Sequence, residues 1–328
     1  MNHQNTNYLF TNLIGSFVLD SNLKIINQIP FKNLEEYQHK EITENKLHQK
    51  YSQLQILPIE KLPQVLELFK DAKYYEQFYQ RNLQLTKQAV KASVSEDLLI
   101  IQAISNISEL DKVINLLTKR LSEWYSLYLP ELVEKYSHQE KLVELICQKS
   151  KKELLQLINL KTEESMGADL EMSHVEEIQA LAKKISDLYK LRRQHEDYLK
   201  IVMKKYCPNI LELAGVTIGA KLLELAHSLK HLALLPASTV QLLGAEKALF
   251  RHIKTGSKSP KYGIIINHPL IQNAPRDLKG KASRMLADKL SLCARLDYFQ
   301  GEFKAPEYRT EVEEALTKSA TNNENSRK

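Results

Sequence analysis

The sequence of 328 residues has few of the residues that interrupt helices or cross-link chains. Nine glycines and ten prolines are few for this length, which favours long helices over β-sandwiches and barrels. The three cysteines, Cys147, Cys207 and Cys293, are isolated, so we expect no disulfide framework and a reducing cytosol. No apolar run approaches the roughly 20 residues that span a bilayer. The start, MNHQNTNYLF, lacks the basic and apolar regions of a signal peptide.

Motifs for cofactor and metal binding are also missing. The segment from Gly215 to Lys221 is one residue short of a phosphate-binding loop, and no Ser or Thr follows its lysine. His227 and His231 have the spacing of helical zinc ligands, but Ser228 stands where a metalloprotease has its glutamate, so we expect structural or solvent-facing histidines. There is no GxGxxG motif for a dinucleotide or methyl-donor fold. We therefore predict no catalytic residue, no metal site and no cofactor.

Positive charge is concentrated near the end of the chain. The net charge is +6, but residues 215–304 hold ten Lys and four Arg against six acidic residues, and the rest of the chain sums to −2. This surplus indicates a polyanionic partner for the C-terminal part, although solubility alone also accounts for a surplus of this size.

The first 95 residues are predicted to form a small α/β domain, within a chain long enough for two or three domains. Two β-rich runs, Ile14–Leu19 and Leu23–Ile29, flank the turn residues 20–22. A polar helix over 33–50, a strand over 54–57 and a helix over 63–69 are expected to follow.

Residues 96–207 are predicted to form a long antiparallel coiled coil, because apolar residues recur there at alternating spacings of three and four. Arg192 and His195 occupy seam positions, where they either fix the register or extend from the edge into water. A second copy of the chain would cover the remaining apolar surface. The first series is Ile107, Leu110, Ile114, Leu117, Leu121, Trp124 and Tyr128, and the second is Leu181, Ile185, Leu188, Arg192, His195, Leu199, Val202 and Tyr206.

Residues 208–304 are predicted to be all helical. One helix is expected over 216–235 and another over 235–256, the second with a capping box at Ser238 and Gln241 and with Gly244 in its interior. A loop over 255–273, with an extended run over 263–266, leads to a last helix over 277–299. The tail, residues 305–328, is polar and expected to fray.

The segment GAEKALFR, Gly244–Arg251, resembles the signature of the Nop domain family. Further blocks follow in the family's order, at residues 235–243, 260–263, 280–282 and 294–299, and upstream at 95–132 and 167–169. The resemblance implies a mainly α fold with a small N-terminal α/β domain, a long antiparallel coiled coil and an all-helical Nop domain over 208–304. The tail lacks long Lys/Glu repeats, so the chain is similar to the shorter archaeal form.

The resemblance also implies a function. Members of the family are non-catalytic scaffolds of the box C/D particle, which methylates ribose 2′-hydroxyls in rRNA and tRNA under RNA guidance. The implied partners are kink-turn guide RNA, a small kink-turn-binding protein that resembles a ribosomal protein, fibrillarin at the N-terminal domain, and a second copy of the chain. S-adenosylmethionine would be bound by fibrillarin and not by this chain. The implied location is the cytoplasm of an archaeon, or the nucleolus of a eukaryote.

The basic surplus and the resemblance together give the residues expected to meet RNA and its bound protein. Cations of the signature segment and of the last helix are candidates for phosphate contacts, although a solvated, self-neutralised face is the alternative for that helix. Gly244 would admit close approach, Glu246 would orient the cations or meet the protein, and His268 would bind a base or sugar. The full set is Gly244, Ala245, Glu246, Lys247, Arg251, Asn267, His268, Lys279, Lys281, Arg284, Lys289 and Arg295.

Three other functions remain to be weighed. A spliceosomal Nop-domain scaffold is disfavoured by the complete GAEK tetrapeptide. An RNA-modifying enzyme that acts alone would need a methyl-donor pocket, for which the sequence has no glycine motif. A purely structural coiled-coil protein would have no affinity for RNA.

Overall fold

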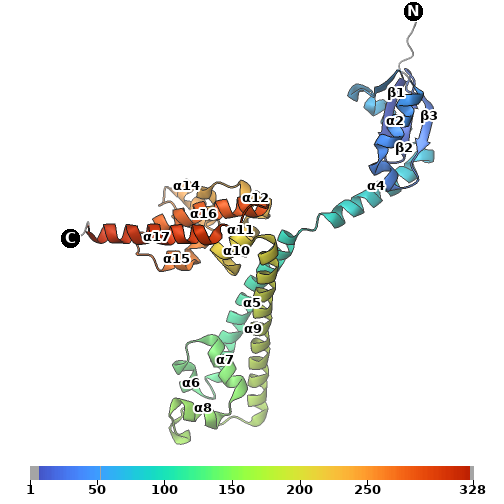
Figure 1. Ribbon diagram of the computed structural model, residues 1–328. Coiled ribbons are helices and arrows are strands. Elements are labelled where there is room, and N and C mark those ends of the chain that lie inside the picture. Colours follow the sequence, from blue (N-terminus) through green and yellow to red (C-terminus); the bar gives the residue numbers. More distant parts are fainter. Residues whose placement is uncertain (1–6, 52, 326–328) are drawn as a thin grey trace, which may run out of the picture. The chain divides into compact units, whose positions relative to one another are not determined.

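The computed structural model describes residues 7–51 and 53–325, which fall into two compact units, 1–94 and 95–328. Most of the segment used above to predict the absence of a signal peptide, residues 1–6, lies outside the described residues, as do the last three residues of the tail. No helix within the described ranges is both long and apolar enough to cross a membrane. Helices dominate and the only sheet found there lies near the N-terminus, which confirms the predicted mainly α fold class (Figure 1).

The first unit is built on a four-stranded sheet in the order β3-β2-β1-β4. β1 pairs antiparallel with β2 and parallel with β4, and β2 pairs antiparallel with β3. The strands are β1 (Asn7–Asn12), β2 (Gly15–Leu19), β3 (Ile25–Pro30) and β4 (Leu54–Ile56). The helices are α1 (Leu34–Gln38), α2 (Lys40–Lys50), the 3₁₀ turn η1 (Ile59–Lys61), α3 (Leu62–Leu68) and α4 (Ala72–Ala92).

Alternation along β2 places apolar side chains on both faces of the sheet. Phe17 packs with Val65 and Phe69 on one face, and Val18 packs with Leu47 on the other. The predicted hairpin is confirmed, and its turn is held by the Asp20 carboxylate, which accepts the N–H groups of residues 22 and 24 at 2.9 and 2.8 Å. The sequence did not predict β1, because polar residues begin and end it.

The second unit begins with the predicted antiparallel coiled coil, formed by α5 (Glu96–Tyr125) and α9 (Met172–Tyr206) (Figure 1). Arg192 Nε donates to Asp111 Oδ1 at 2.5 Å, and its Nη1 lies 2.9 Å from Glu196 Oε1. His195 Nε2 lies 3.0 Å from Asn106 Nδ2. These contacts favour the interpretation that Arg192 and His195 fix the register.

The structure differs from the predicted seam at its end. Trp124 is 38% exposed, and its neighbour Tyr125 is buried instead. Short helices complete the tip between the two long ones: α6 (Pro130–Lys135), α7 (Gln139–Gln148), α8 (Lys151–Ile158) and the 3₁₀ turn η2 (Thr162–Glu164). Gly167 packs against the turn that follows α5, and a Cβ there would lie 2.0 Å from the carbonyl oxygen of Tyr128. Only glycine allows the two backbones to approach so closely.

Most of the remaining helices pack around α16 (Lys279–Tyr298). Their core is continuous with the base of the coiled coil, because Ile104 of α5 and Met203 of α9 belong to the same apolar cluster as Leu223 and Leu290. The other elements are α10 (Pro208–Ala214), α11 (Val216–Ala226), α12 (Leu229–Leu234), α13 (Ala237–Leu242), α14 (Glu246–Thr255), the 3₁₀ turn η3 (Ile264–Asn267), α15 (Pro269–Gln272) and α17 (Ala305–Asn325).

Buried hydrogen bonds hold this part together at one point. The Asp297 carboxylate accepts the backbone N–H groups of Asn209 and Ile210 and the Asn209 amide, at 2.9–3.0 Å. Asn209 Oδ1 in turn accepts the N–H groups of Lys304 and Ala305 at 2.8 and 3.0 Å. The start of α10, the end of α16 and the start of α17 are therefore joined through two side chains.

The predictions of one continuous helix over 216–235 and another over 235–256 were both wrong, because each region contains two shorter helices. The first breaks at His227, which has φ of 66°, and the Ser228 hydroxyl then accepts the His231 N–H and starts α12. The second breaks at Gly244, whose φ of 85° is left-handed, so this glycine is not in a helix interior. No Ser238 cap forms, because α13 already begins at residue 237 behind Pro236.

Two further expectations for the C-terminal part were wrong, whereas the helix expected over 277–299 is confirmed as α16. The run over 263–266 is mostly the 3₁₀ turn η3 and not extended. The tail is the helix α17, held by buried Ala305 and Val312. Two apolar anchors in a polar segment gave too weak a periodic signal to predict it.

Candidate nucleic-acid interface

α14 begins at Glu246, within the GAEKALFR segment, and is a ten-residue helix with no buried residue. Phe250 and Ile253 are 64% and 70% exposed, although both are large and apolar. A helix is normally held to its protein by burial of its apolar face. This helix leaves that face in water, where a partner can cover it.

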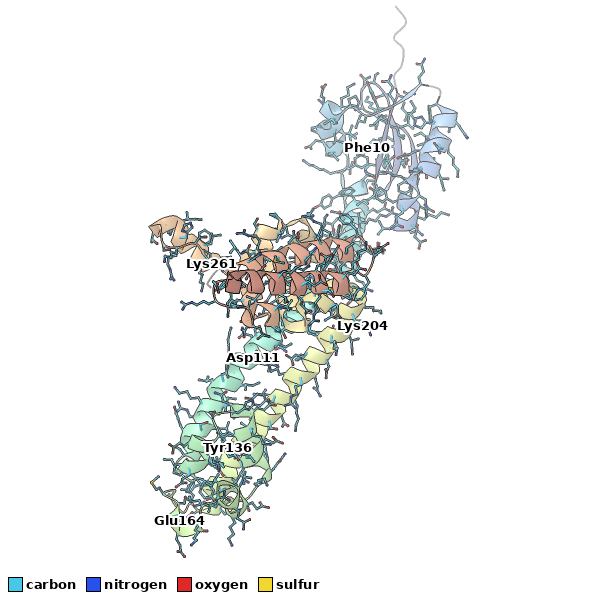
Figure 2. The ribbon with its side chains drawn as sticks, turned by 60° about the vertical axis from the view of Figure 1, so that its left-hand side comes forward. Phe10, Asp111, Tyr136, Glu164, Lys204 and Lys261 are labelled. Carbon is cyan, nitrogen blue, oxygen red and sulfur yellow. The ribbon has the colours of Figure 1, made fainter. Side chains whose placement is uncertain are left out.

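The same helix carries unpaired positive charge. Lys247, Arg251 and Lys254 are exposed, and within the described ranges their side chains form no ion pair or hydrogen bond. Figure 2 shows the orange helix extending away from the other C-terminal helices. α14 therefore presents cations and apolar side chains together, on a helix that contributes no buried residue to the core.

The turn before α14 depends on Gly244 and Glu246. The Gly244 N–H donates to Glu246 Oε1 at 2.7 Å, and Ala245 N–H donates to the Leu242 carbonyl at 2.9 Å. Only glycine adopts a φ of 85° without strain. The Glu246 carboxylate thus holds the turn that starts α14, a role that the sequence did not indicate.

The loop after α14 adds a lysine that the sequence analysis did not choose. Gly263 N–H and Ile264 N–H donate to the carbonyls of Gln241 and Leu243, both at 2.7 Å, which brings the loop back to α13. Lys261 Cδ then lies 3.7 Å from the position of a Cβ on Gly280. Lys261 therefore joins the cations at the start of α16. The PKYG block was the only sequence signal for it.

The cations of α16 differ in their exposure and in whether other side chains or the backbone bind them. Arg284 is exposed and, in the part of the chain that the structure describes, makes no ion pair. Lys279 is half-buried and Lys281 donates to Ser319 of α17 at 2.7 Å. Arg295 is exposed, but its Nε donates to the Ala233 carbonyl at 3.2 Å. Arg284, near the start of α16, is thus the cation of this helix that is most available to a partner.

Two of the predicted RNA-contacting side chains are occupied by partners within the protein. Lys289 is half-buried, pairs with Glu311 and lies 4.7 Å from the Tyr308 ring, so it secures α17. His268 is 5% exposed: Nε2 donates to the Leu213 carbonyl at 2.9 Å, and Nδ1 accepts the Leu270 N–H at 3.2 Å. Burial lowers the pKa of His268, which keeps the ring neutral. Asn267, its neighbour, is exposed and stays a candidate.

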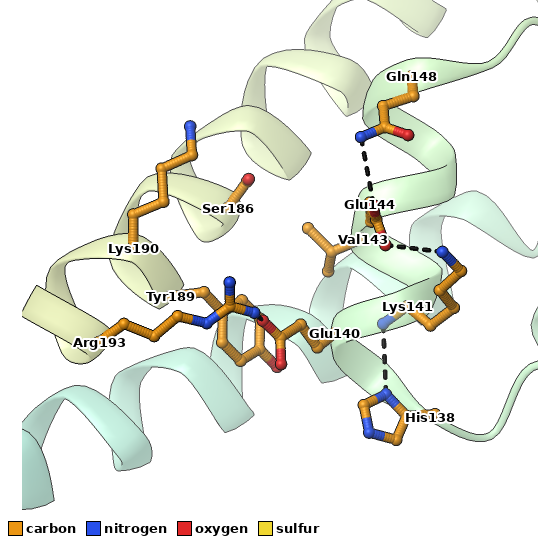
Figure 3. Close-up of a pocket in the computed structure, with 10 residues that line it drawn as sticks. All are labelled: His138, Glu140, Lys141, Val143, Glu144, Gln148, Ser186, Tyr189, Lys190 and Arg193. Carbon is orange, nitrogen blue, oxygen red and sulfur yellow. Dashed lines mark hydrogen bonds and ion pairs between the residues drawn. The ribbon is translucent and has the colours of Figure 1, made fainter. Parts of the chain in front are cut away.

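A cavity of about 400 Å³ lies between α7 and α9 (Figure 3). Its charged side chains pair with one another: Glu140 with Arg193, and Lys141 with Glu144 at 2.8 Å. Lys190 pairs with Asp187 at 3.1 Å. The cavity is therefore a crevice lined by ion pairs that hold the tip to α9, and it presents no arrangement of nucleophile and base.

The histidines with zinc-like spacing have separate structural roles. His227 ends α11, and His231 Nδ1 lies 2.8 Å from the Ala226 carbonyl oxygen. Within residues 7–51 and 53–325, no three His, Cys, Asp or Glu side chains gather as metal ligands do.

Comparison with known proteins assigns this part of the chain to a family. A profile described as "Nop: snoRNA binding domain, fibrillarin" matches residues 106–318, which include α14, the returning loop and α16. The chain belongs to the Nop family. The match confirms the resemblance drawn from the GAEKALFR segment and its accompanying blocks.

Relatives within the Nop family come from archaea and eukaryotes. The chain is 42% identical over 252 residues to an uncharacterized NOP5 family protein of Methanocaldococcus jannaschii, covering 71% of this chain and 61% of that protein. It is 37% identical over 248 residues to nucleolar protein 56 of Caenorhabditis elegans, covering 67% and 50%. The chain thus spans about half to three-fifths of the length of these curated relatives.

One solved structure, titled as a fibrillarin/Nop5p complex, is similar to this chain at 26% sequence identity and a TM-score of 0.43. The similarity covers 93% of this chain and 99% of that chain.

Proposed function

We propose that this chain is a non-catalytic scaffold of a box C/D particle, which guides ribose 2′-O-methylation. Its C-terminal helices bind kink-turn RNA together with a small kink-turn-binding protein, and its N-terminal unit recruits fibrillarin. Membership in the Nop family supports the role, since the family description names both snoRNA binding and fibrillarin. S-adenosylmethionine is bound by fibrillarin. The site of action is the cytoplasm in an archaeon and the nucleolus in a eukaryote.

One observation carries the proposal: α14 holds unpaired cations and exposed apolar side chains on a single helix. RNA phosphates would pair with the cations, because contacts to backbone phosphates dominate the affinity of proteins for nucleic acid. Phosphates do not account for exposed Phe250 and Ile253, which need an apolar partner. A surface made jointly of RNA and protein satisfies both.

Self-association through the coiled coil follows from a second row of apolar residues. On α5, Val113 and Leu116 are 44% and 68% exposed. On α9, Leu191, Tyr198 and Ile201 are 38–69% exposed and are spaced by seven and three residues. Heptad-like spacing outside the internal seam is suited to a second pair of helices. We propose that a second copy of the chain supplies them.

The proposal is tested by titrating the full chain into kink-turn RNA, with and without its small protein partner, in a gel-shift assay. We expect binding to the RNA–protein complex, with an affinity that falls steeply with salt and a logarithmic slope of several units. A slope near zero would exclude phosphate contacts as the main source of affinity. Failure to bind the complex at low ionic strength would exclude the function itself.

Charge reversal at the start of α16 tests its share of the interface. Replacing Lys281 and Arg284 by glutamate should weaken binding to the RNA–protein complex about tenfold or more, because each change removes a phosphate contact. Self-association, measured by analytical ultracentrifugation, should be unchanged, since neither residue lies on the coiled coil. Unchanged RNA affinity would remove this helix from the interface.

A methyl-transfer assay distinguishes a scaffold from an enzyme that acts alone. The purified chain is incubated with guide RNA, target RNA and labelled S-adenosylmethionine, in the presence and absence of fibrillarin. We expect transfer only when fibrillarin is added, and transfer without it would refute the scaffold proposal.

A further inference from the structure

The end of α16 exposes three aromatic side chains within six residues. Tyr298, Phe299 and Phe303 are 36%, 70% and 55% exposed. The rings of Tyr298 and Phe299 meet edge to face, with centroids 5.0 Å apart. Exposed aromatic surface of this size in a folded protein usually marks a binding site. None of these residues belongs to the interface at α14.

A left-handed turn presents these rings. Gly301 N–H donates to the Leu296 carbonyl at 2.7 Å, which closes the end of α16, and Gln300 takes the left-handed position with φ of 54°. Glycine is the usual residue there, because any other side chain is strained. Here glutamine takes this conformation, and it lines a cavity.

That cavity has a volume of about 460 Å³, within the range of small-ligand pockets. Its walls combine rings and polar groups: Tyr206 and Lys205 from the end of α9, Tyr298 and Gln300 from the end of α16, and Phe303 beyond it. Figure 2 labels Lys204 on the same end of α9. The cavity lies entirely within the second unit.

Two lysines at the end of α9 carry unpaired positive charge, and one of them, Lys205, lines the cavity. Lys204 and Lys205 are exposed and form no ion pair with any residue in the described ranges. Lys304 and Glu302 neutralise each other at 2.9 Å. The Asp297 carboxylate is occupied by N–H groups of Asn209 and Ile210. Free ammonium groups therefore stand beside exposed rings.

We propose that this cavity binds an unpaired nucleotide of RNA, whose base stacks on Phe303 or Tyr298 and whose phosphate meets Lys205. Rings and cations together are the means by which proteins hold single-stranded nucleic acid. The amide of Gln300 supplies a donor and an acceptor for the edge of the base. The inference deepens the proposed function, on which it rests, by assigning the chain a second RNA contact that reads single strands.

The test uses the full chain and a fluorescein-labelled oligouridylate of about ten nucleotides, in the range of known single-strand site sizes. Its affinity is compared by fluorescence anisotropy with that of an abasic oligomer carrying the same number of phosphates. We expect the abasic oligomer to bind at least about fivefold more weakly. Equal affinities would overturn the proposal, because phosphates alone would then account for binding.

Variants locate the effect. Tyr298→Leu with Phe303→Leu replaces the two proposed stacking rings by aliphatic side chains, and should weaken oligouridylate binding at least about fivefold. Phe303→Tyr should retain affinity. Tyr75→Leu changes a ring that is 53% exposed in the first unit, and is the matched control expected to have no effect. A 4-thiouridine-substituted oligomer should crosslink to the peptides around 204–206 or 298–303.

Other outcomes separate this inference from the proposed function. If the double leucine variant binds oligouridylate normally but loses self-association or fibrillarin, the aromatic patch is a protein contact and the nucleotide proposal is wrong. If the intact chain ignores the kink-turn complex yet shows ring-dependent oligouridylate binding, the proposed function fails and the nucleotide site stands.

Discussion

Replacing both Lys247 and Arg251 of α14 by glutamate should weaken binding of the full chain to a kink-turn RNA–protein complex by roughly 100-fold. Each cation is exposed and unpaired within the described ranges, so its charge is available to a phosphate. A hydrogen bond to a charged group contributes about 1.5–3 kcal/mol, and about 3 kcal/mol for the two corresponds to this factor. The measurement is a gel-shift or anisotropy titration at fixed salt.

The matched control reverses Lys87 and Lys91 on α4, which are likewise exposed and change the net charge equally. Their reversal should leave affinity within about twofold, because they lie in the other unit. The melting temperature of the α14 variant should be unchanged, since α14 has no buried residue. Equal losses in both variants would mean that overall charge, and not α14, drives binding.

Asp297→Ala should destabilise the second unit by about 3–5 kcal/mol, the largest stability change that we expect from a single substitution outside the apolar core. It leaves the N–H groups of Asn209 and Ile210 without their acceptor in a half-buried site. For a unit of this size the melting temperature should fall by roughly 10 °C. Circular dichroism melting or calorimetry measures the change.

Asp288→Ala is the matched control, because Asp288 is an exposed carboxylate on the same helix, α16. Its effect should stay within about 0.5 kcal/mol, as is usual for surface positions. Asp297→Asn, which keeps one oxygen acceptor, should fall between the two. A melting temperature for Asp297→Ala equal to that of the control would show that solvent replaces the lost acceptor.

Much of the fold was predictable from periodic patterns. Ile107, Ile114 and Leu121 are buried residues of α5 spaced seven apart. Phe17, Val18 and Leu19 alternate between the two faces of the sheet, both of which are covered by apolar side chains. Such signals are local, since each depends only on spacing along the chain. They located the hairpin, the coiled coil and α16.

The features that the sequence did not reveal depend on backbone conformation or on distant partners. Nothing local distinguishes a helical His227 from one with φ of 66°, and Gly244 is compatible with both a helix interior and a turn. His268 is occupied by the Leu213 carbonyl, 55 residues away in sequence. Lys289 likewise meets a residue of α17, a helix that was expected to fray.

The candidate site was predictable in its residue types and only partly in its members. The positive surplus and the GAEKALFR segment pointed to Lys247 and Arg251, which the structure leaves exposed. The sequence does not reveal the exposure of Phe250, because a large apolar residue in a helix is normally buried. Lys261 was missed because its position beside Gly280 exists only in three dimensions.

The continuous core at the base of the coiled coil has a consequence for handling this protein in pieces. Cutting the chain between residues 207 and 208 would separate Ile104 and Met203 from Leu223 and Leu290. Both fragments would then expose apolar side chains that are buried in the intact core. Ser105 would also lose Glu224, to which it donates at 2.6 Å. A fragment meant to preserve the C-terminal helices should therefore start at Ser95, and recombination between relatives should exchange 95–325 as one block.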